Sequence, residues 1–160
     1  GINVAGDEYT DAGEMTWSAD QPLAGNDWGW TGQRSEEEST TEAIGGTTED
    51  ELFQSRRTGI FAYEFSDVPA GTYEIELGFA EYEALYPERD RVFDVLVDGE
   101  YVMVAHDIAA EVGGLYADVH TVVIEHDGGD LEIDLGNRRG YELPVVSTIS
   151  VTERGDLSAG

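Results

Sequence analysis

Hydrophobic and polar residues alternate at a period of two along much of this chain. In residues 73–79 the odd positions hold Tyr, Ile, Leu and Phe, with Glu, Glu and Gly between them, and residues 131–135 repeat the pattern with Leu, Ile and Leu. Such alternation is typical of a β-strand with one buried and one solvated face. A chain that repeats it is restricted to sheets whose apolar faces pack against another layer.

Further apolar runs predict more strands, and turn sequences separate them. These runs cover residues 91–97, 100–106, 118–126 and 144–151. Turns are expected at Pro69-Ala70-Gly71, at 127–130 and at Asp98-Gly99, where the sequence predicts a β-hairpin. Only residues 106–114 look helical, and for no more than a turn or two. Many short strands with turns between them predict an all-β fold, an antiparallel β-sandwich.

The stretch from Gln33 to Glu51 shows neither the alternation of a strand nor the apolar periodicity of a helix, and we predict a long exposed loop there. The chain of 160 residues is long enough for one domain. We place that domain at residues 1–152 and a C-terminal tail or linker at 153–160. Because the chain opens at Gly1 without a Met, we expect it to be one domain of a larger protein.

The charge of the chain sets limits on its partners. Asp and Glu number 35 against 8 basic residues, giving a net charge of −27. A surface of this sign does not suit nucleic acid or anionic membranes, and no segment approaches the roughly 20 apolar residues of a membrane span. An acidic disordered chain is the alternative, but a hydrophobic content of 40% argues against it. We predict a folded protein adapted to high salt, where self-repulsion is screened.

Catalytic and metal-binding patterns are weak. His106, His120 and His126 have no Cys and no helical HExxH spacing around them, and His120 and His126, in or beside a predicted strand, are expected to be surface or structural residues. No serine lies in a nucleophile elbow, and in so acidic a chain a pair of carboxylates is uninformative. A structural Ca²⁺ ion near residues 5–14 or 126–130 is weighed against solvated acidic turns, which we favour. We therefore predict no enzyme activity, no catalytic metal and no cofactor.

Five aromatic residues fall in segments predicted to be loops. A flat ring with a polar edge suits the apolar C–H face of a sugar, and nearby polar groups suit its hydroxyls. The alternative is that each ring packs on the edge of the core. The predicted stacking residues are Trp28, Trp30, Tyr82, Tyr86 and Tyr141. The predicted hydroxyl-binding residues are Arg57, Glu83 and Glu142, and Thr58 is a fourth candidate.

Several motifs occur in an order that resembles the malectin domain family. They are "FAE" at 79–81 with "RVFDVLVDGE" at 91–100, "LFQSRRTGIFAYEF" at 52–65, "HDIAAEVGG" at 106–114 and "YELPVVSTISV" at 141–151. The resemblance implies a jelly-roll-like β-sandwich with a carbohydrate-binding cleft formed by loops at one end. It also implies a non-catalytic module that binds glucose-type oligosaccharides or polysaccharides, at the cell surface or in a secreted protein.

The resemblance carries over unevenly to individual residues. The family's first aromatic matches Trp28, whereas its second falls on Thr58, so that ring is missing. Its aromatic pair after "FAE" falls in a loop where Tyr82 and Tyr86 are the replacements, and its Asp matches Glu142. These departures leave open the sugar that is bound. Two other functions remain as alternatives: a structural or interaction module of a larger surface protein or filament, and a glycoside-active enzyme.

Overall fold

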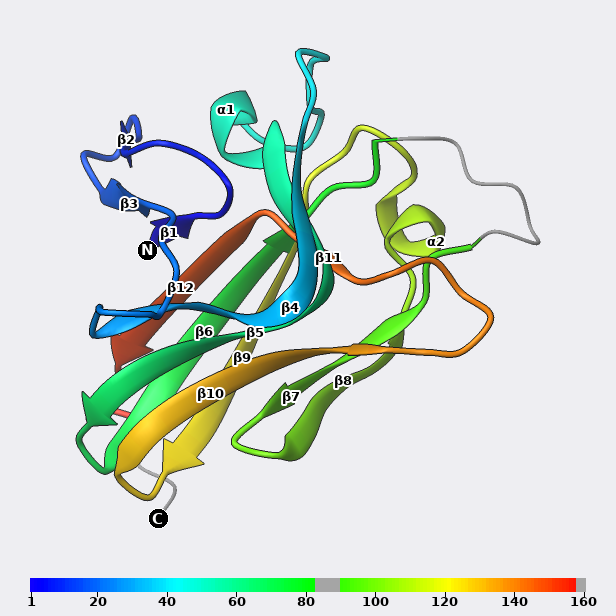
Figure 1. Cartoon of the computed structure of the whole chain (residues 1–160). Coiled ribbons are helices and arrows are strands. Elements are labelled where there is room, and N and C mark those ends of the chain that lie inside the picture. The colour runs from blue at the N-terminus through cyan, green and yellow to red at the C-terminus, as the bar shows by residue number, and fades with distance from the viewer. Residues whose placement is uncertain (83–89, 158–160) are drawn as a thin grey trace.

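The computed structural model describes residues 1–82 and 90–157, and it is a sandwich of two β-sheets (Figure 1). The first sheet has the order β2 (Tyr9–Thr10), β3 (Thr16–Ala19), β1 (Ile2–Asn3), β12 (Thr148–Glu153), β6 (Gly71–Phe79) and β9 (Asp118–His126). The second has the order β11 (Val145–Val146), β5 (Ser55–Val68), β10 (Gly129–Asn137), β7 (Phe93–Val97) and β8 (Glu100–His106), and β4 (Trp28–Ser39) pairs with β5. Paired strands are antiparallel except β1 with β3. The predicted all-β, antiparallel sandwich is confirmed.

The main core lies between the inner faces of the two sheets. Its side chains come from alternate positions, as the period of two predicted: in β6, Ile75, Leu77 and Phe79 are fully buried while Glu74 and Glu76 are not. Strands β7 and β10 supply a similar set from the second sheet. Burial of an aliphatic or aromatic side chain stabilises the fold by about 1.5–3 kcal/mol each, so this core is the main source of stability.

A second apolar cluster covers the outer side of the first sheet. It joins Trp17 from β3 with Ile44, Leu52 and Phe53 from the segment around helix α1 (Asp50–Phe53). The prediction of a continuous loop over 33–51 is wrong at both ends, because residues 33–39 belong to β4 and residue 50 begins α1. Only residues 40–49 lie between these elements.

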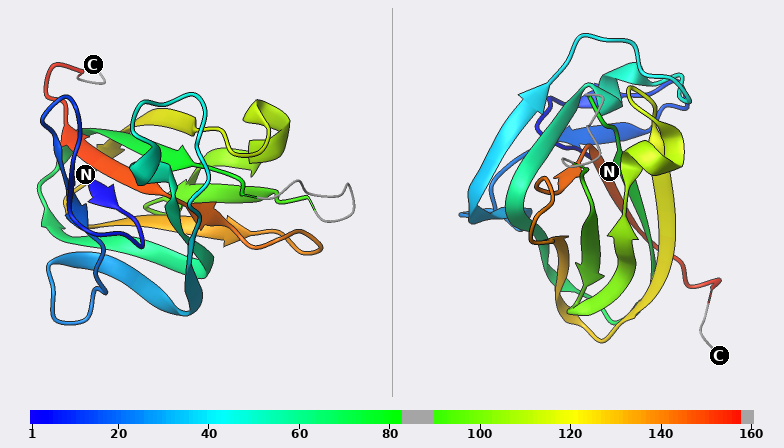
Figure 2. Two further views of the ribbon diagram at one scale, coloured as in Figure 1. Left: turned by 90° about the horizontal axis from the view of Figure 1, so that it is seen from above. Right: turned by 90° about the vertical axis from the view of Figure 1, so that its right-hand side faces the viewer.

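The two ends of the sandwich carry different connections. The turns β5–β6, β7–β8 and β9–β10 lie together at one end, whereas helix α2 (Ile108–Val112) and the segment 138–144 lie at the other (Figures 1 and 2). The predicted hairpin at Asp98-Gly99 is confirmed, with φ of 51° and 82° at the two residues, the pair of positive angles that a type I′ turn requires. The predicted short helix is α2, capped by the Asp107 carboxylate, which accepts a hydrogen bond from the Ala110 amide.

Candidate functional site

Strands β4 and β5 turn sharply together part of the way along their length (Figure 1). The register between them shifts between Thr31 and Arg34, so that Gly32 and Gln33 stand opposite a single residue of β5. Such a bulge bends the strand and increases its twist. Gly32 has φ of 124° and Gly59 has φ of 137°, and a Cβ on Gly59 would lie 2.0 Å from the Arg34 carbonyl oxygen. Glycine at these two positions therefore allows the bend.

A cleft of about 370 Å³ lies at this bend. Residues 33–36 of β4 form one wall, and Thr58, Gly59 and Leu143 complete the lining. Its groups are mostly polar: the Gln33 amide, the Arg34 guanidinium, the Ser35 and Thr58 hydroxyls and the Glu36 carboxylate. Such a set can donate and accept hydrogen bonds to a neutral polyhydroxylated ligand.

Backbone and side-chain hydrogen bonds hold the segment before β11 against the cleft. The Thr58 hydroxyl donates to the Pro144 carbonyl at 3.1 Å, and the Gly59 amide donates to the same oxygen at 3.2 Å. The Glu142 amide donates to the Asp90 carbonyl at 3.2 Å. Thr58, Glu142 and the chain that follows the "FAE" loop are thus neighbours, and Tyr141 stands beside them, 48% exposed.

A buried ionic cluster fixes the base of the "FAE" loop. The Glu81 carboxylate, 1% exposed, accepts from Arg91 Nε at 2.8 Å and lies 3.4 Å from Arg56 Nη1. Arg91 also donates to the Leu143 carbonyl, and Arg56 donates to the Ala80 carbonyl at 2.9 Å. Glu81 and Arg91 flank the segment 83–89. This cluster therefore joins both ends of that segment to the chain that precedes β11.

Three of the predicted binding residues lie apart from this cleft. Trp28 begins β4, faces Phe65 in the register and stacks on its ring at a centroid distance of 6.5 Å. Along β5, Phe65 is seven positions from Thr58, or roughly 23 Å at 3.3 Å per residue. Trp28 and Trp30 both pack against the main core. The structure does not bring either ring together with Tyr141 and Glu142.

Arg57 is the third of these residues, and it has a packing role. Its guanidinium lies 4.2 Å from the centre of the Trp30 ring, 3.2 Å from Asp20 and 3.3 Å from Glu37. The Tyr63 hydroxyl also donates to Asp20, and burial raises the pKa of Tyr63 well above its ordinary value. Arg57 is only 3% exposed, so its N–H groups are directed at protein rather than at the cleft.

The predicted binding residues that follow "FAE" (79–81) divide into two groups. Tyr82 turns inward: its hydroxyl donates to the Phe53 carbonyl at 2.8 Å, the Arg56 guanidinium lies 4.0 Å from its ring centre, and it packs on the second apolar cluster. Burial raises the pKa of this phenol. Glu83 and Tyr86, predicted to bind sugar, lie outside the described residues.

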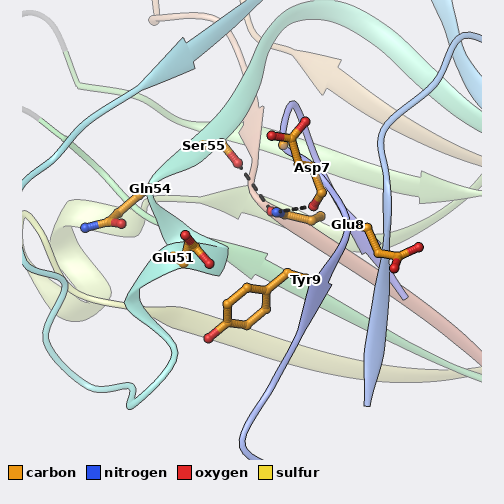
Figure 3. A pocket seen from close by; sticks show the side chains of 8 residues that line it. Asp7, Glu8, Tyr9, Glu51, Gln54 and Ser55 are labelled. Carbon is orange, nitrogen blue, oxygen red and sulfur yellow. Dashed lines mark hydrogen bonds between the residues drawn. The ribbon is translucent and has the colours of Figure 1, made fainter. Parts of the chain in front are cut away.

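A second hollow, of about 330 Å³, separates the N-terminal segment from α1 (Figure 3). Asp7, Glu8 and Glu51 line it together with Tyr9 and Gln54. The hydrogen bond with Glu49 raises the pKa of the Tyr9 hydroxyl to about 12, so this ring remains neutral at physiological pH. The hollow is acidic and lacks a basic group among its lining residues. Part of the segment 5–14, one of the two segments considered above for a structural Ca²⁺ ion, lines this hollow.

The sequence matches the malectin domain over residues 1–159. The chain belongs to the malectin domain family. It is also 31% identical over 127 residues to a kinesin-like protein, KIN-14E, of Oryza sativa subsp. japonica, a match that covers 73% of this malectin domain and 12% of the kinesin-like protein.

Solved structures have the same fold. A β-glucuronidase of Bacteroides uniformis is similar at a TM-score of 0.85 and 27% identity, over 96% of this chain and 18% of the enzyme. The ANX2 ectodomain of Arabidopsis thaliana is similar at 0.77 and 14%, over 95% of this chain and 48% of the ectodomain. The plant receptor-like kinase FER, solved with the peptide RALF23 and LLG2, gives 0.77 and 18%, over 95% and 47%. This malectin domain therefore spans less than half of each of these chains.

The wall of the cleft that β4 provides is not predicted by the sequence. Residues 33–36 carry no apolar alternation, so the sequence predicts a loop there and does not indicate Gln33, Arg34 or Glu36 as binding residues. The one available signal was Gly32, since a glycine inside a strand often marks a bulge.

Across the described parts of the chain, no helix is long and apolar enough to cross a membrane.

Proposed function

We propose that this malectin domain is a carbohydrate-binding module and that its ligand binds in the cleft at the bend of β4 and β5. The observation that carries the proposal is a cleft of about 370 Å³ that Thr58 and Leu143 line, with Tyr141 and Glu142 in the segment directly before Leu143. Tyr141 offers an exposed ring for stacking, and Glu142 and Thr58 offer acceptors for hydroxyls. Arg34 and Glu36 extend the polar lining on the opposite wall. Glu83 and Tyr86 remain predicted contacts from the neighbouring loop.

The chemistry of the cleft favours a neutral sugar over a charged one. Arg34 and Glu36 offset each other's charge, and the net charge of −27 disfavours anionic ligands such as uronates. Glucose-type oligosaccharides are the first class to test, because the family resemblance points to them. The proposal includes no bond cleavage: incubation with a panel of glucans should release no reducing sugar.

The test is a glycan array and a titration of the array's hits, both in 2 M KCl. Glu142→Gln keeps the shape of the side chain and removes its charge, and Tyr141→Ala removes the ring. Loss of one hydrogen-bonded hydroxyl partner changes binding by about 1–3 kcal/mol, or roughly 5- to 150-fold. We expect each variant to weaken sugar binding within that range while the melting temperature stays the same.

Tyr101→Ala is the matched control. Tyr101 is also an exposed tyrosine, 64% accessible, but it lies on β8, whereas Tyr141 is two residues from Leu143 in the lining of the cleft. Sugar affinity that falls in Tyr101→Ala as much as in Tyr141→Ala would contradict the proposed cleft. A folded protein that binds nothing on the array would contradict carbohydrate binding itself.

A protein-binding module is the second candidate, favoured by a different surface. Strands β8 and β9 are the edges of the two sheets. They expose Tyr101, Val104, Val119 and Val123, each at 49–64%, on an otherwise charged protein. Exposed apolar residues on open strands are typical of contact surfaces. Sedimentation in high salt tests self-association: a monomer at all concentrations would contradict assembly through these edges.

The surroundings in which the module works are proposed on the same basis. We infer an extracellular or cell-surface location as part of a larger protein, since the similar plant chains are described as ectodomains. We also infer a high-salt environment from the charge of −27. Both inferences are independent of which sugar is bound.

A further inference from the structure

Two histidines and an aspartate meet where the edges of the two sheets approach each other. His106 is the last residue of β8, and Asp118 and His120 lie at the start of β9. One nitrogen of each imidazole and one carboxylate oxygen all lie within 4.8 Å of one another. We propose that these three residues form a binding site for a divalent transition metal ion of the zinc class.

The orientation of the two rings supports this site. His106 directs Nε2 at one oxygen of Asp118, at 2.6 Å, and His120 directs Nε2 at the other oxygen, at 2.9 Å. The ring centroids are 4.6 Å apart and the rings are nearly perpendicular, at 79°. The same nitrogen of each ring is therefore directed at the one carboxylate, and all three ligand atoms lie within 4.8 Å of one another.

The donor set selects the class of ion. Imidazole nitrogen together with a carboxylate suits Zn²⁺, Co²⁺, Ni²⁺ and Cu²⁺, whereas Ca²⁺ and Mg²⁺ require a larger set of oxygen ligands. Three protein ligands leave a fourth tetrahedral position for water. The His120 side chain is 34% exposed, so solvent reaches the site from its side. Such an arrangement binds an ion that can exchange with solution.

A small movement brings the three ligands into metal geometry. Zn–N and Zn–O bonds of about 2.0–2.1 Å place two tetrahedral ligands roughly 3.3 Å apart. The Nε2–Oδ distances of 2.6 and 2.9 Å are shorter than that, as hydrogen bonds require. An entering ion replaces both hydrogen bonds, and the Nε2–Oδ distances lengthen by about half an ångström. The His120 side, which is partly exposed, has room for this adjustment.

The surrounding residues hold His106 and Asp118 in place. His106 packs against the rings of Phe79 and Phe93, at centroid distances of 5.2 and 5.7 Å. Phe79 faces Asp118 in the β6–β9 pair, and Phe93 faces His106 in the β7–β8 pair. His106 and Asp118 are 6% and 4% exposed. An ion at this point would join β8 of one sheet to β9 of the other, at an edge where no strand pairing connects them.

The test is a titration of the chelator-treated full chain with ZnCl₂ in 2 M potassium nitrate, with excess Mg²⁺ to occupy surface carboxylates. We expect one Zn²⁺ per chain. His120→Gln and Asp118→Asn should each weaken binding at least tenfold. Zn²⁺ at about 100 times its dissociation constant should raise the melting temperature by roughly 5–10 °C, since a ligand that binds only the folded state stabilises it.

His126→Gln is the matched control, because His126 lies at the opposite end of β9 and bonds Asp98 and the Gly129 carbonyl. It should bind Zn²⁺ as the wild type does. Co²⁺ offers a readout that needs no variant: visible absorption of a four-coordinate Co²⁺ in the wild type supports the site. Zn²⁺ affinity that is unchanged in His120→Gln, or wild-type binding no tighter than that of Mg²⁺, would overturn the proposal. Sugar binding is measured separately and does not depend on the outcome.

Discussion

At the scale of single residues, Glu81 is a buried carboxylate that pairs with two arginines. It lies between Arg56 and Arg91 with 1% exposure, and its removal leaves the buried Arg91 without this carboxylate and Arg56 with Glu38. Breaking a buried ion pair in this way costs about 3–5 kcal/mol. We expect Glu81→Gln to lower the free energy of unfolding by that amount in a denaturant titration.

Glu38 provides the comparison for Glu81, because it pairs with the same arginine. Glu38 lies 2.7 Å from Arg56 Nη2, but its side chain is 41% exposed. An exposed pair contributes about 0–1 kcal/mol. Glu38→Gln should therefore change the unfolding free energy far less than Glu81→Gln. Equal effects of the two substitutions would show that burial does not decide the strength of this cluster.

Residue-level inference from the sequence was effective only where a motif fixed the position. Thr58 was indicated only by the family resemblance and lines the cleft, whereas Glu142 was indicated by the residue pattern as well and directly precedes the lining residue Leu143. The sequence indicates Arg57 as a hydroxyl-binding candidate, but nothing in its sequence position predicts that it pairs with Asp20 and Glu37. The contacts of Arg57 depend on strands distant in the sequence, and alternation of apolar residues does not report them.

At the scale of elements, the bend in β4 and β5 depends on Gly59. A side chain there would have to adopt φ of 137° and would meet the Arg34 carbonyl oxygen at 2.0 Å. We expect Gly59→Ala to destabilise the domain and to weaken sugar binding, because the β4 wall of the cleft must move. Gly155→Ala is the control, since a Cβ there meets nothing within 4 Å. Full sugar affinity in Gly59→Ala would show that sugar binding does not depend on the bend.

A second element-scale prediction concerns the carboxylates between β5 and β10. The hydrogen bond with Asp134, followed by burial and by Glu64, raises the pKa of Glu132 to about 7. The folded state therefore holds a proton that the unfolded state releases above about pH 4.5. Stability from this group is complete below that pH and is lost as pH rises through 7.

The test of this prediction is the melting temperature measured from pH 4 to pH 8. We expect Glu132→Gln to be more stable than the wild type at pH 8 and to lose less stability between pH 4.5 and 7. Glu100→Gln removes the same charge from an exposed position on β8 and is the control. If Glu132→Gln and Glu100→Gln gave the same pH profile, the raised pKa of Glu132 would not be the cause of the pH dependence of stability.

The elements themselves were predicted where packing imposes a period. Strands β6 and β10 face the core on one side, and their alternation indicated them clearly. Strand β4 was missed over 33–39 because that half faces solvent or arginines, and its position comes from backbone pairing with β5. Helix α1 spans four residues, too few to show a helical period.

At the scale of the whole molecule, the net charge of −27 is spread over a protein of 17.4 kDa. Repulsion between such charges reaches about 10 Å in 0.1 M salt and about 3 Å in 1 M salt. We expect the melting temperature to rise steeply between 0.1 and 2 M KCl, measured by circular dichroism. Sucrose, which stabilises folded proteins by exclusion from their surface but does not screen charge, is the control, and KCl should raise the melting temperature more. A melting temperature that stays constant with KCl would contradict salt adaptation.

The pairing of β1 with β12 also has a consequence for how the chain is made. Ile2 pairs with Ile149, and both lie in the core. During translation at roughly 5–20 residues per second, the first strand waits about ten seconds or more for its partner to leave the ribosome. The apolar residues of the domain's first strand are therefore among the last of this domain to be sequestered. A chaperone that binds exposed apolar segments of nascent chains has its longest opportunity at this strand.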